Sequence, residues 1–570
     1  MTDIETRARE WISGDPDPAT RSELEAILSS GDTRELADRM AGVIPFGTAG
    51  IRGVVEAGSN RMNRATVIRT TAGLADYLLD IAEGGERIVA VGRDARPSSA
   101  VFMEETVAVL VAAGFDVRYF AAPTPTPLVA YAGLSMNACA SIVITASHNP
   151  PRDNGYKVYA ANGAQIISPA DSDIAAAIAS IGRASEVDRS THPFDDPAAR
   201  PIGPEMFQSY LRDVAKSVPP GTSDQSIRIV YTAMHGVGGR FVVDALQRFG
   251  YTNVHPVAAQ FEPDGTFPTV AFPNPEEPGA LDLAHKLAHA LDADIVLAND
   301  PDTDRLAVSV PDPSGAWRPL TGNQIGALLA EFLLTNSGDG TTINSIVSSP
   351  LLGTIAERHG ATWAKTLTGF KWIWNAALEL EAEGQGELIF GYEEALGYSV
   401  GTTVRDKDGI SAAVAFAALA GQAAATGATV LDKLGELYRT YGVWVSAQVS
   451  IRREGSAGLE DIAHAMDALR SRQPSELRGY DVVDVRDFNL HADTRPSYLG
   501  ATNLIELDLG AAGRVLARPS GTEPKLKIYV DLSEPFPESG DWIGAERELS
   551  ERANEVGSAL AIWLTDAMPS

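Results

Sequence analysis

The sequence contains a single cysteine, Cys139, among its 570 residues. One thiol cannot form an intramolecular disulfide, so a reducing compartment suits the chain. No run of 18 uninterrupted apolar residues occurs, and residues 1–11 are charged and lack the apolar core of a signal peptide. These absences predict a soluble, cytoplasmic protein with no membrane partner.

Positive charge is also scarce, because 46 Lys and Arg face 75 Asp and Glu, which gives a net charge of −29. Such a surface on average repels nucleic acid and anionic membranes, so neither is expected as a partner. A small anionic substrate would need a local basic pocket. No Gly-Lys-Ser/Thr step of a Walker A motif occurs, so ATP is not implied.

The length suggests roughly four domains at about 150 residues each. Short β-branched runs alternate with Ala- and Leu-rich helical stretches up to Tyr441, a rhythm typical of βαβ units, and alternating strands follow it. We predict three tandem α/β domains with mixed sheets and a smaller C-terminal α+β domain. The expected parts are a helical segment at 1–45 and domains at 46–204, 205–320, 321–441 and 442–570.

Individual elements are predicted from the apolar pattern. Strands are expected at 88–91, 141–145, 227–231, 295–298, 346–348 and 387–390, and after Tyr441 at 443–451, 503–509 and 526–532. The main helices are expected at 65–83, 98–113, 239–249, 323–334, 459–472 and 542–564.

A serine follows the apolar run Ala140-Ser141-Ile142-Val143-Ile144, which is typical of a buried strand. The chain continues Thr145-Ala146-Ser147-His148-Asn149-Pro150, so Ser147 stands at the strand's carboxyl end, where α/β proteins place their chemistry. Because Ser, Asn and Pro are also common turn residues, an ordinary turn is the alternative for this segment taken alone.

Three aspartates, Asp300, Asp302 and Asp304, alternate along a loop directly after another apolar run. Carboxylates at this spacing can converge on one hard cation, and oxygen-only ligands favour Mg²⁺ or Ca²⁺ over zinc. The loop is no EF-hand, because Arg305 replaces the required glycine and Pro311 the required glutamate. The alternative, a solvated acidic loop, is weakened because crowded carboxylates repel one another.

Two glycine-bearing loops have the composition of anion sites: residues 47–53 and 518–525. Glycine lets N–H groups approach an oxyanion closely, while hydroxyls and a guanidinium add donors that match phosphate. Either loop alone could be a turn. In so acidic a chain, however, Arg518, Ser520 and Thr522 around Gly521 favour a phosphate pocket.

Two adjacent glutamates, Glu393 and Glu394, follow a further predicted strand, and their carboxylates could bind sugar hydroxyls. The overlapping segment 397–401 matches the G-x-S-x-G pattern of hydrolases. We reject this match, because a charged loop follows the serine instead of a helix, and only His464 and His491 remain downstream.

In this order the motifs resemble those of the α-D-phosphohexomutase family, over nearly all of residues 34–532. The family's phosphoserine, metal, sugar and phosphate loops correspond to residues 145–150, 300–305, 391–397 and 518–522. The Phe-Gly-Thr-Ala-Gly-Ile-Arg-Gly run at 46–53 and the Thr-Gly-Phe-Lys-Trp-Ile run at 368–373 resemble most closely the branch of phosphoglucomutases and phosphopentomutases. This resemblance implies domains arranged around one central cleft.

The resemblance also implies a role for each matching residue. The catalytic set would be Ser147 as phosphate carrier, Lys157 as general acid/base, His148 as a residue that orients the phosphoserine, and Arg52 facing phosphate. Mg²⁺ would be held by Asp300, Asp302, Asp304 and a phosphoryl oxygen on Ser147. Substrate binding is implied for Arg305, Thr368, Gly369, Lys371, Glu393, Lys407, Arg518, Ser520, Gly521 and Thr522.

Lysine chemistry sets a condition on the role of Lys157. A lysine acts as a general base only if its pKa falls, which burial and neighbouring cations favour and phosphate opposes. The alternative for Lys157 is a charge partner of phosphate that transfers no proton.

The implied reaction is reversible phosphate transfer between C1 and C6 of glucose phosphate, with glucose 1,6-bisphosphate as intermediate and activator. Ala395 stands where many family members carry serine and resembles the pentose-active branch, so a phosphopentomutase acting on ribose or deoxyribose 1-phosphate is an alternative, as is a phosphomannomutase. A catalytically silent phosphosugar-binding regulator and a phosphatase are alternatives of other classes. Both a monomer and a homodimer are compatible with the sequence.

Overall fold

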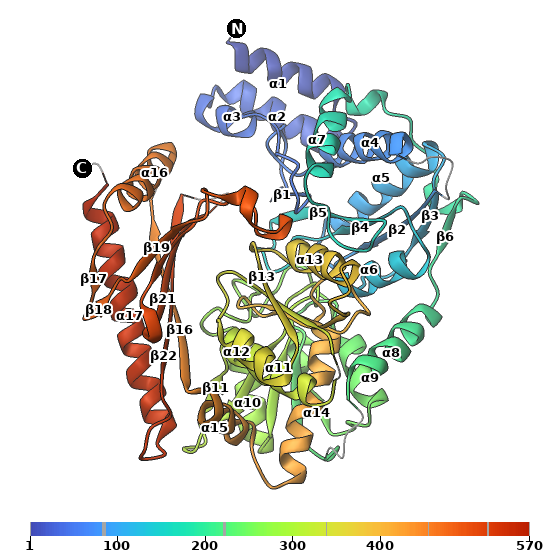
Figure 1. Ribbon diagram of the computed structural model, residues 1–570. Coiled ribbons are helices and arrows are strands. Elements are labelled where there is room, and N and C mark those ends of the chain that lie inside the picture. The colour runs from blue at the N-terminus through green and yellow to red at the C-terminus, as the bar shows by residue number, and fades with distance from the viewer. Residues whose placement is uncertain are drawn as a thin grey trace. The chain divides into compact units, whose positions relative to one another are not determined.

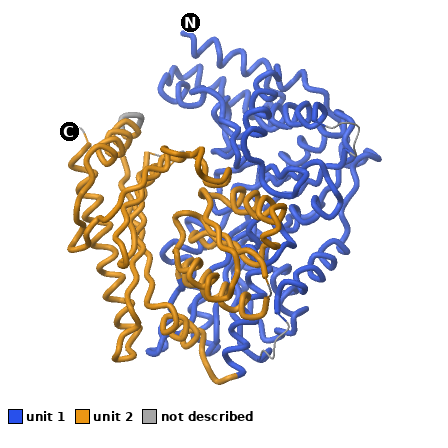
Figure 2. The backbone as a smooth tube through the Cα atoms, viewed as in Figure 1, with its two compact units in different colours: residues 1–320, 397–425 blue, residues 321–396, 426–570 orange. Residues whose placement is uncertain are grey.

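The computed structural model describes residues 2–81, 87–219, 224–337, 339–453, 455–520 and 524–568. By its contacts the chain divides into two compact units (Figure 2). Unit 1 comprises residues 1–320 and 397–425, and unit 2 comprises residues 321–396 and 426–570.

Unit 1 begins with three short helices, α1 (Asp3–Gly14), α2 (Pro18–Ser30) and α3 (Thr33–Arg39). Thr2, Asp17 and Asp32 cap their amino ends by accepting hydrogen bonds from backbone N–H groups. The helices pack around a small apolar core that includes Leu24 and Leu36.

The first sheet of unit 1 has six strands, and the loop that carries Ser147 follows one of its parallel strands. Its order is β1 (Ile51–Val54), β5 (Asp153–Ala160), β4 (Ala140–Ile144), β2 (Ile88–Arg93), β3 (Asp116–Tyr119) and β6 (Ala199–Pro201). Strands β4, β2, β3 and β6 are parallel, whereas β5 runs antiparallel to β4, and β1 runs antiparallel to β5. Every residue of β4 is buried, which explains its uninterrupted apolar run. Its helices are α4 (Arg64–Ile81), α5 (Ser99–Ala112), α6 (Thr126–Ser135) and α7 (Ala170–Ser180), of which α5 and α6 pack directly on β2 (Figure 1).

The second sheet of unit 1 has five strands, in the order β11 (Trp317–Pro319), β10 (Ala307–Pro311), β9 (Ile295–Ala298), β7 (Ile229–Thr232) and β8 (Val254–Pro256). Strands β9, β7 and β8 are parallel, and β10 and β11 are antiparallel. Its helices are α8 (Glu205–Ser217), α9 (Gly239–Arg248) and α10 (Asp282–Leu291). The returning segment of unit 1 contains β15 (Gly397–Val400) and α14 (Gly409–Ala425), and α14 packs on α9.

Unit 2 opens with parallel strands in the order β13 (Thr362–Thr366), β12 (Thr341–Ser345) and β14 (Leu388–Glu393). Its helices there are α11 (Gly322–Thr335), α12 (Leu351–His359), α13 (Phe370–Ala382) and α15 (Val430–Tyr441). The strand predicted at 346–348 is wrong, because β12 ends at Ser345 and the apolar residues beyond it form a turn. The strand itself is polar in composition yet wholly buried, so its pattern gave no apolar signal.

The remainder of unit 2 is an antiparallel sheet in the order β16 (Val443–Arg452), β22 (Lys525–Glu534), β21 (Gly513–Pro519), β20 (Ile505–Asp508) and β19 (Asp484–Asp487). Helix α17 (Trp542–Asp566) packs on it, beside α16 (Gly455–Ser471) and the short hairpin of β17 (Glu476–Leu477) and β18 (Tyr480–Asp481). Short 3-10 helices lie at Ala184–Glu186, Pro193–Asp195, Ala258–Gln260, Ala492–Thr494, Ser497–Leu499 and Gly510–Ala512. Three α/β sheets and a C-terminal α+β part confirm the predicted fold class.

No single helix among the described residues has both the length and the apolar character needed to cross a membrane. One bent pair, Gly409–Ala425 with Val430–Tyr441, meets that test only when the two helices are taken together.

A buried hydrogen bond joins the returning segment, residues 397–425, to the rest of unit 1. Tyr210 on α8 donates to Asp408 Oδ2 at 2.6 Å, and both side chains are buried. We expect Tyr210→Phe to lower the free energy of unfolding by about 1–3 kcal/mol, because a buried carboxylate loses a donor. Denaturant titration followed by circular dichroism measures the change.

The matched control is Tyr131→Phe, which removes the same type of bond, to Asp213 at 2.6 Å. The Asp213 side chain is 36% exposed, so water replaces the lost donor and the expected loss is under about 1 kcal/mol. Equal losses in the two variants would contradict this explanation.

Candidate active site

Ser147 lies just beyond the carboxyl end of β4 and is 5% exposed. Its backbone has φ +53°, a left-handed conformation that is uncommon for a residue other than glycine. The Ser147 hydroxyl donates to Asp300 Oδ2 at 2.8 Å and lies 3.3 Å from His148 Nδ1. The structure therefore brings the predicted serine loop and the predicted aspartate loop together inside unit 1.

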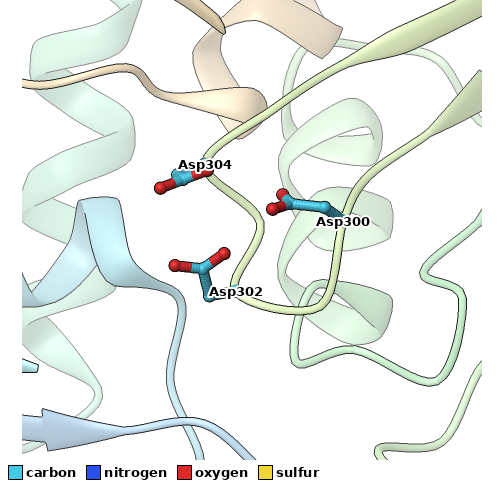
Figure 3. Close-up of side chains that lie close together, drawn as sticks. All are labelled: Asp300, Asp302 and Asp304. Carbon is cyan, nitrogen blue, oxygen red and sulfur yellow. The ribbon is translucent and has the colours of Figure 1, made fainter. Parts of the chain in front are cut away.

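The three aspartates form a compact cluster on the loop after β9. Asp300, Asp302 and Asp304 are fully buried, and their ligand oxygens lie within 4.8 Å of one another. The carboxylates turn toward one another from a single loop (Figure 3). Asp302 Oδ1 and Asp304 Oδ1 are buried without a hydrogen-bond partner in the described part of the chain. Buried, unpartnered carboxylate oxygens in an all-oxygen set fit a hard divalent cation such as Mg²⁺.

Two lysines contact the aspartate cluster. Lys157, on β5, donates to Asp302 Oδ2 at 2.7 Å and to Asp304 Oδ2 at 2.9 Å. Lys407, in the returning segment, lies 2.9 Å from Asp304 Oδ2. Burial lowers the pKa of Lys157, but the Asp302 and Asp304 carboxylates outweigh burial and raise it well above its ordinary value. This direction is opposite to the one that a general base requires. The sequence analysis did not anticipate it, because nothing in the sequence reveals that the aspartates contact the lysine.

The pKa values of the carboxylates in the cluster shift in different directions. Burial, together with the Asp304 and Asp302 charges, raises the pKa of Asp300 well above its ordinary value. Burial acts in the same direction on Asp302, but Lys157 outweighs it, so the pKa of Asp302 is lowered. A carboxylate of this cluster that contacts a lysine therefore loses its proton more readily than one that does not.

His148 and the two predicted phosphate-facing arginines lie around the serine. Burial and the positive charges of Arg305 and Arg52 hold the pKa of His148 well below its ordinary value, so the imidazole is neutral. Arg305 is largely buried, its N–H donates to Asp300 Oδ1 at 3.1 Å, and its guanidinium lies 3.8 Å from Glu276. A neutral His148 is suited to a hydrogen bond with a serine-bound phosphate.

The glycine loop at 47–53 uses its backbone differently from the sequence expectation. The N–H groups of Gly47 and Gly50 donate to each other's carbonyls, at 3.1 and 2.8 Å, so neither points to an anion. Gly50 has φ +75°, and a Cβ there would overlap the Tyr156 carbonyl on β5. Glycine at this position therefore permits packing against β5, and Arg52 on the same loop is exposed.

Several supporting residues were missed by the sequence analysis. Thr126, at the start of α6, donates from Oγ1 to Asp302 Oδ2 at 2.8 Å. Asp406 accepts hydrogen bonds from Tyr159 at 2.6 Å and Gln165 at 2.9 Å, which fixes the segment that carries Lys407. Arg96, after β2, contacts the serine loop. The position of Arg96 beyond a parallel strand next to β4 is the one sequence signal that could have found it.

Unit 2 holds the other predicted binding residues. Arg518, on β21, donates to Thr368 Oγ1 at 3.0 Å, and the N–H of Gly369 donates to Glu393 Oε1 at 2.7 Å. A cavity of about 190 Å³ is lined by Ile346, Leu367, Thr368, Lys371, Trp372, Thr502, Leu504 and Arg518. Ser520 is described and its N–H donates to the Lys525 carbonyl, whereas the predicted Gly521 and Thr522 lie outside the described residues.

Glu394 differs from its neighbour Glu393. Its Oε2 accepts hydrogen bonds from Ser348 at 2.8 Å and Ser345 at 3.2 Å, both beyond or at the end of β12. One carboxylate oxygen of Glu394, a half-buried residue, is therefore occupied by two hydroxyls of the protein itself. Of the two glutamates that the sequence offered for sugar hydroxyls, Glu393 is the one adjoining the Thr368–Gly369 loop.

Comparisons with known proteins show the family of the chain. Four models of the phosphoglucomutase/phosphomannomutase family match in order: alpha/beta/alpha domain I at residues 44–185, domain II at 208–315, domain III at 321–441 and the C-terminal domain at 481–534. A probable phosphomannomutase of Haemophilus influenzae is 41% identical over 85% of this chain and 96% of its own length. The phosphopentomutase of Mus musculus is 35% identical, with coverage of 97% and 94%.

Two further similarities extend the comparison. The glucose 1,6-bisphosphate synthase of Homo sapiens is 33% identical over 96% of this chain and 93% of its own length. The crystal structure of a putative phosphomannomutase from Thermus thermophilus has the same fold, with a TM-score of 0.69 at 22% identity and coverage of 91% and 99%. The chain belongs to the phosphoglucomutase/phosphomannomutase family and is an intramolecular phosphotransferase.

Proposed function

We propose that the protein interconverts glucose 1-phosphate and glucose 6-phosphate through a phosphorylated Ser147 and a glucose 1,6-bisphosphate intermediate. The observation that carries the proposal is the hydrogen bond of 2.8 Å between the Ser147 hydroxyl and Asp300, within a buried cluster of three carboxylates and two lysines. Positioning and charge stabilisation supply most of the catalysis in phosphoryl transfer.

Each half of the reaction exchanges one P–O bond for another. The free sugar hydroxyl attacks the phosphorus on Ser147, the bond between phosphorus and Oγ breaks, and the bisphosphate forms. Lys157, which the aspartates keep protonated, acts first as an acid: it gives its proton to Oγ as the P–O bond breaks and takes the proton of the attacking sugar hydroxyl in its place, so the protonation state of the lysine is restored. Reversal with the other phosphate of the bisphosphate rephosphorylates Ser147 and releases the isomer.

The other residues of the site bind the metal, the phosphate groups and the sugar. Asp300, Asp302 and Asp304 would hold Mg²⁺, which when bound offsets the negative charge of the phosphoryl group. Arg52 and Arg305 bind phosphate oxygens, and neutral His148 orients the phosphoserine. In unit 2, Arg518, Thr368 and Lys371 bind the phosphate already on the sugar, and Glu393 accepts hydrogen bonds from its hydroxyls.

A pentose substrate is the second candidate. Ala395 removes a hydroxyl that the family often supplies to the sugar, and two of the full-length relatives are a phosphopentomutase of mouse and one of human. A pocket with one polar contact fewer discriminates less strictly between sugars of different size.

Phosphorylation of Ser147 is tested by intact-mass analysis of the purified protein. We expect a phosphate adduct that glucose 1,6-bisphosphate increases and that Ser147→Ala abolishes, with mutase activity reduced by at least about 1,000-fold. The control Ser180→Ala alters an exposed serine on α7 and leaves adduct and activity unchanged. A Ser147→Ala variant that retains the adduct, or an active enzyme that never carries one, would contradict the proposal.

Substrate preference is tested by comparing kcat/KM for glucose, ribose and mannose 1-phosphates with a trace of the corresponding bisphosphate. Glucose 1-phosphate is expected to give the highest value, and ribose 1-phosphate a measurable one. Negligible turnover of glucose 1-phosphate beside strong turnover of either other sugar would replace the proposed substrate.

The metal site is tested by titration calorimetry with Mg²⁺. Asp304→Asn is expected to weaken Mg²⁺ binding by at least about 10-fold, because it removes a charged ligand from the cluster. Asp312→Asn is the matched control, since Asp312 lies in an exposed turn after β10 and bonds to Ser314. Wild-type affinity in Asp304→Asn would exclude the aspartate cluster as the metal site.

A further inference from the structure

Arg96 lies between β2 and α5, and only 2% of its surface is exposed. Its Nε donates to Asp94 Oδ2 at 3.1 Å. Its two terminal nitrogens donate to four backbone carbonyls, those of Ser147 at 2.7 Å, Asn149 at 2.6 Å, Pro150 at 2.6 Å and Asp153 at 2.9 Å. One side chain therefore binds the serine loop at three carbonyls and the first residue of β5 at a fourth.

The guanidinium is itself held in place on its other sides. Asp94 is 1% exposed, and its Oδ1 accepts hydrogen bonds from the Arg96 N–H at 2.9 Å and from Ser99 Oγ at 2.5 Å. The ring of Phe267 lies 5.2 Å from the guanidinium carbon. A buried cation with a fixed counter-charge and an aromatic neighbour has little freedom to move.

The loop depends on these contacts for its shape. Within residues 146–151 the backbone-to-backbone hydrogen bonds are local turn bonds, from the N–H of Asn149 to Ala146 and from the N–H of Asp153 to Pro150; the first long-range one after them is from the N–H of Val55 to the Arg152 carbonyl. The left-handed backbone of Ser147 is a conformation that persists when the surrounding structure enforces it. Since Arg96 binds the Ser147 carbonyl directly, it constrains the residue whose hydroxyl contacts Asp300.

We propose that Arg96 is a positioning residue for phosphoryl transfer. It fixes the backbone of the serine loop, so that Ser147 Oγ and the phosphate on it stay aligned with the aspartate cluster. Arg96 reaches no group assigned to the sugar, so its effect falls on transfer and not on sugar binding. This inference rests on the proposed mutase function. The competing explanation is an arginine that contributes to stability alone.

The test is Arg96→Lys in the full-length protein. Lysine keeps the charge but donates from a single nitrogen, so it cannot bind four carbonyls and Asp94 together. We expect kcat and the rate of Ser147 phosphorylation by glucose 1,6-bisphosphate to fall about 100-fold, with KM for glucose 1-phosphate within about threefold of wild type.

Arg39→Lys is the matched control. Arg39 is also buried, at 7% exposure, and binds Glu23 and Glu35 among the N-terminal helices. Both variants are expected to lower the melting temperature, but only Arg96→Lys should lower kcat. Similar kcat values in the two variants would overturn the positioning role and leave a structural one.

A second variant covers the case in which Arg96→Lys does not fold. Asp94→Asn keeps the guanidinium and removes its counter-charge. We expect kcat to fall by a larger factor than the factor by which KM changes. A wild-type kcat in this variant would overturn the inference. A wild-type protein with neither phosphoserine nor mutase activity overturns the proposed function and this role together. An active wild type with an unimpaired Arg96→Lys overturns the role of Arg96 alone.

Discussion

The burial of three carboxylates on one loop is the constraint on which the site in unit 1 depends. Asp300, Asp302 and Asp304 could not remain ionised in the interior without positive charge close to them. Lys157 comes from β5 of the first sheet, and Lys407 comes from the segment that returns after unit 2. The electrostatic balance of one loop therefore requires two sheets and a distant part of the chain to fold together.

The residues that support the serine and aspartate loops are also polar and buried. Thr126 orients Asp302, Asp406 fixes the segment of Lys407, and Arg96 holds the carbonyls of the serine loop. Such networks cost stability if one member is missing, because its partners are left buried and unsatisfied. What they provide in return is a serine hydroxyl and a ligand set with little freedom, which is what phosphoryl transfer requires.

Sequence patterns predicted the elements that end at the site, because chemistry follows buried parallel strands. The strand at 295–298 is a continuous apolar run, and a polar loop with the three aspartates follows it directly. This abrupt change is a strong local signal. Long-range partners have no such signal. Nothing in the sequence near Lys157 indicates that it contacts Asp302 and Asp304, so the direction of its pKa was not predictable. The same holds for β12, whose polar residues are buried only by their neighbours in space.

The distribution of the functional groups bears on how sugar specificity can vary within one architecture. Unit 1 contains Ser147, the aspartate cluster and both lysines that contact it, and under the proposed function none of these needs to recognise a particular sugar. Unit 2 contains Glu393 and the Thr368–Arg518 pair, in which the Gly369 N–H donates to Glu393 and Arg518 donates to Thr368. Ala395 lies next to Glu394, whose carboxylate accepts hydrogen bonds from Ser345 and Ser348. Under the proposed function, a change at this position would alter the surroundings of the sugar without disturbing the buried charges of unit 1. Relatives named for mannose, pentose and glucose phosphates are consistent with transfer chemistry that stays constant while recognition changes.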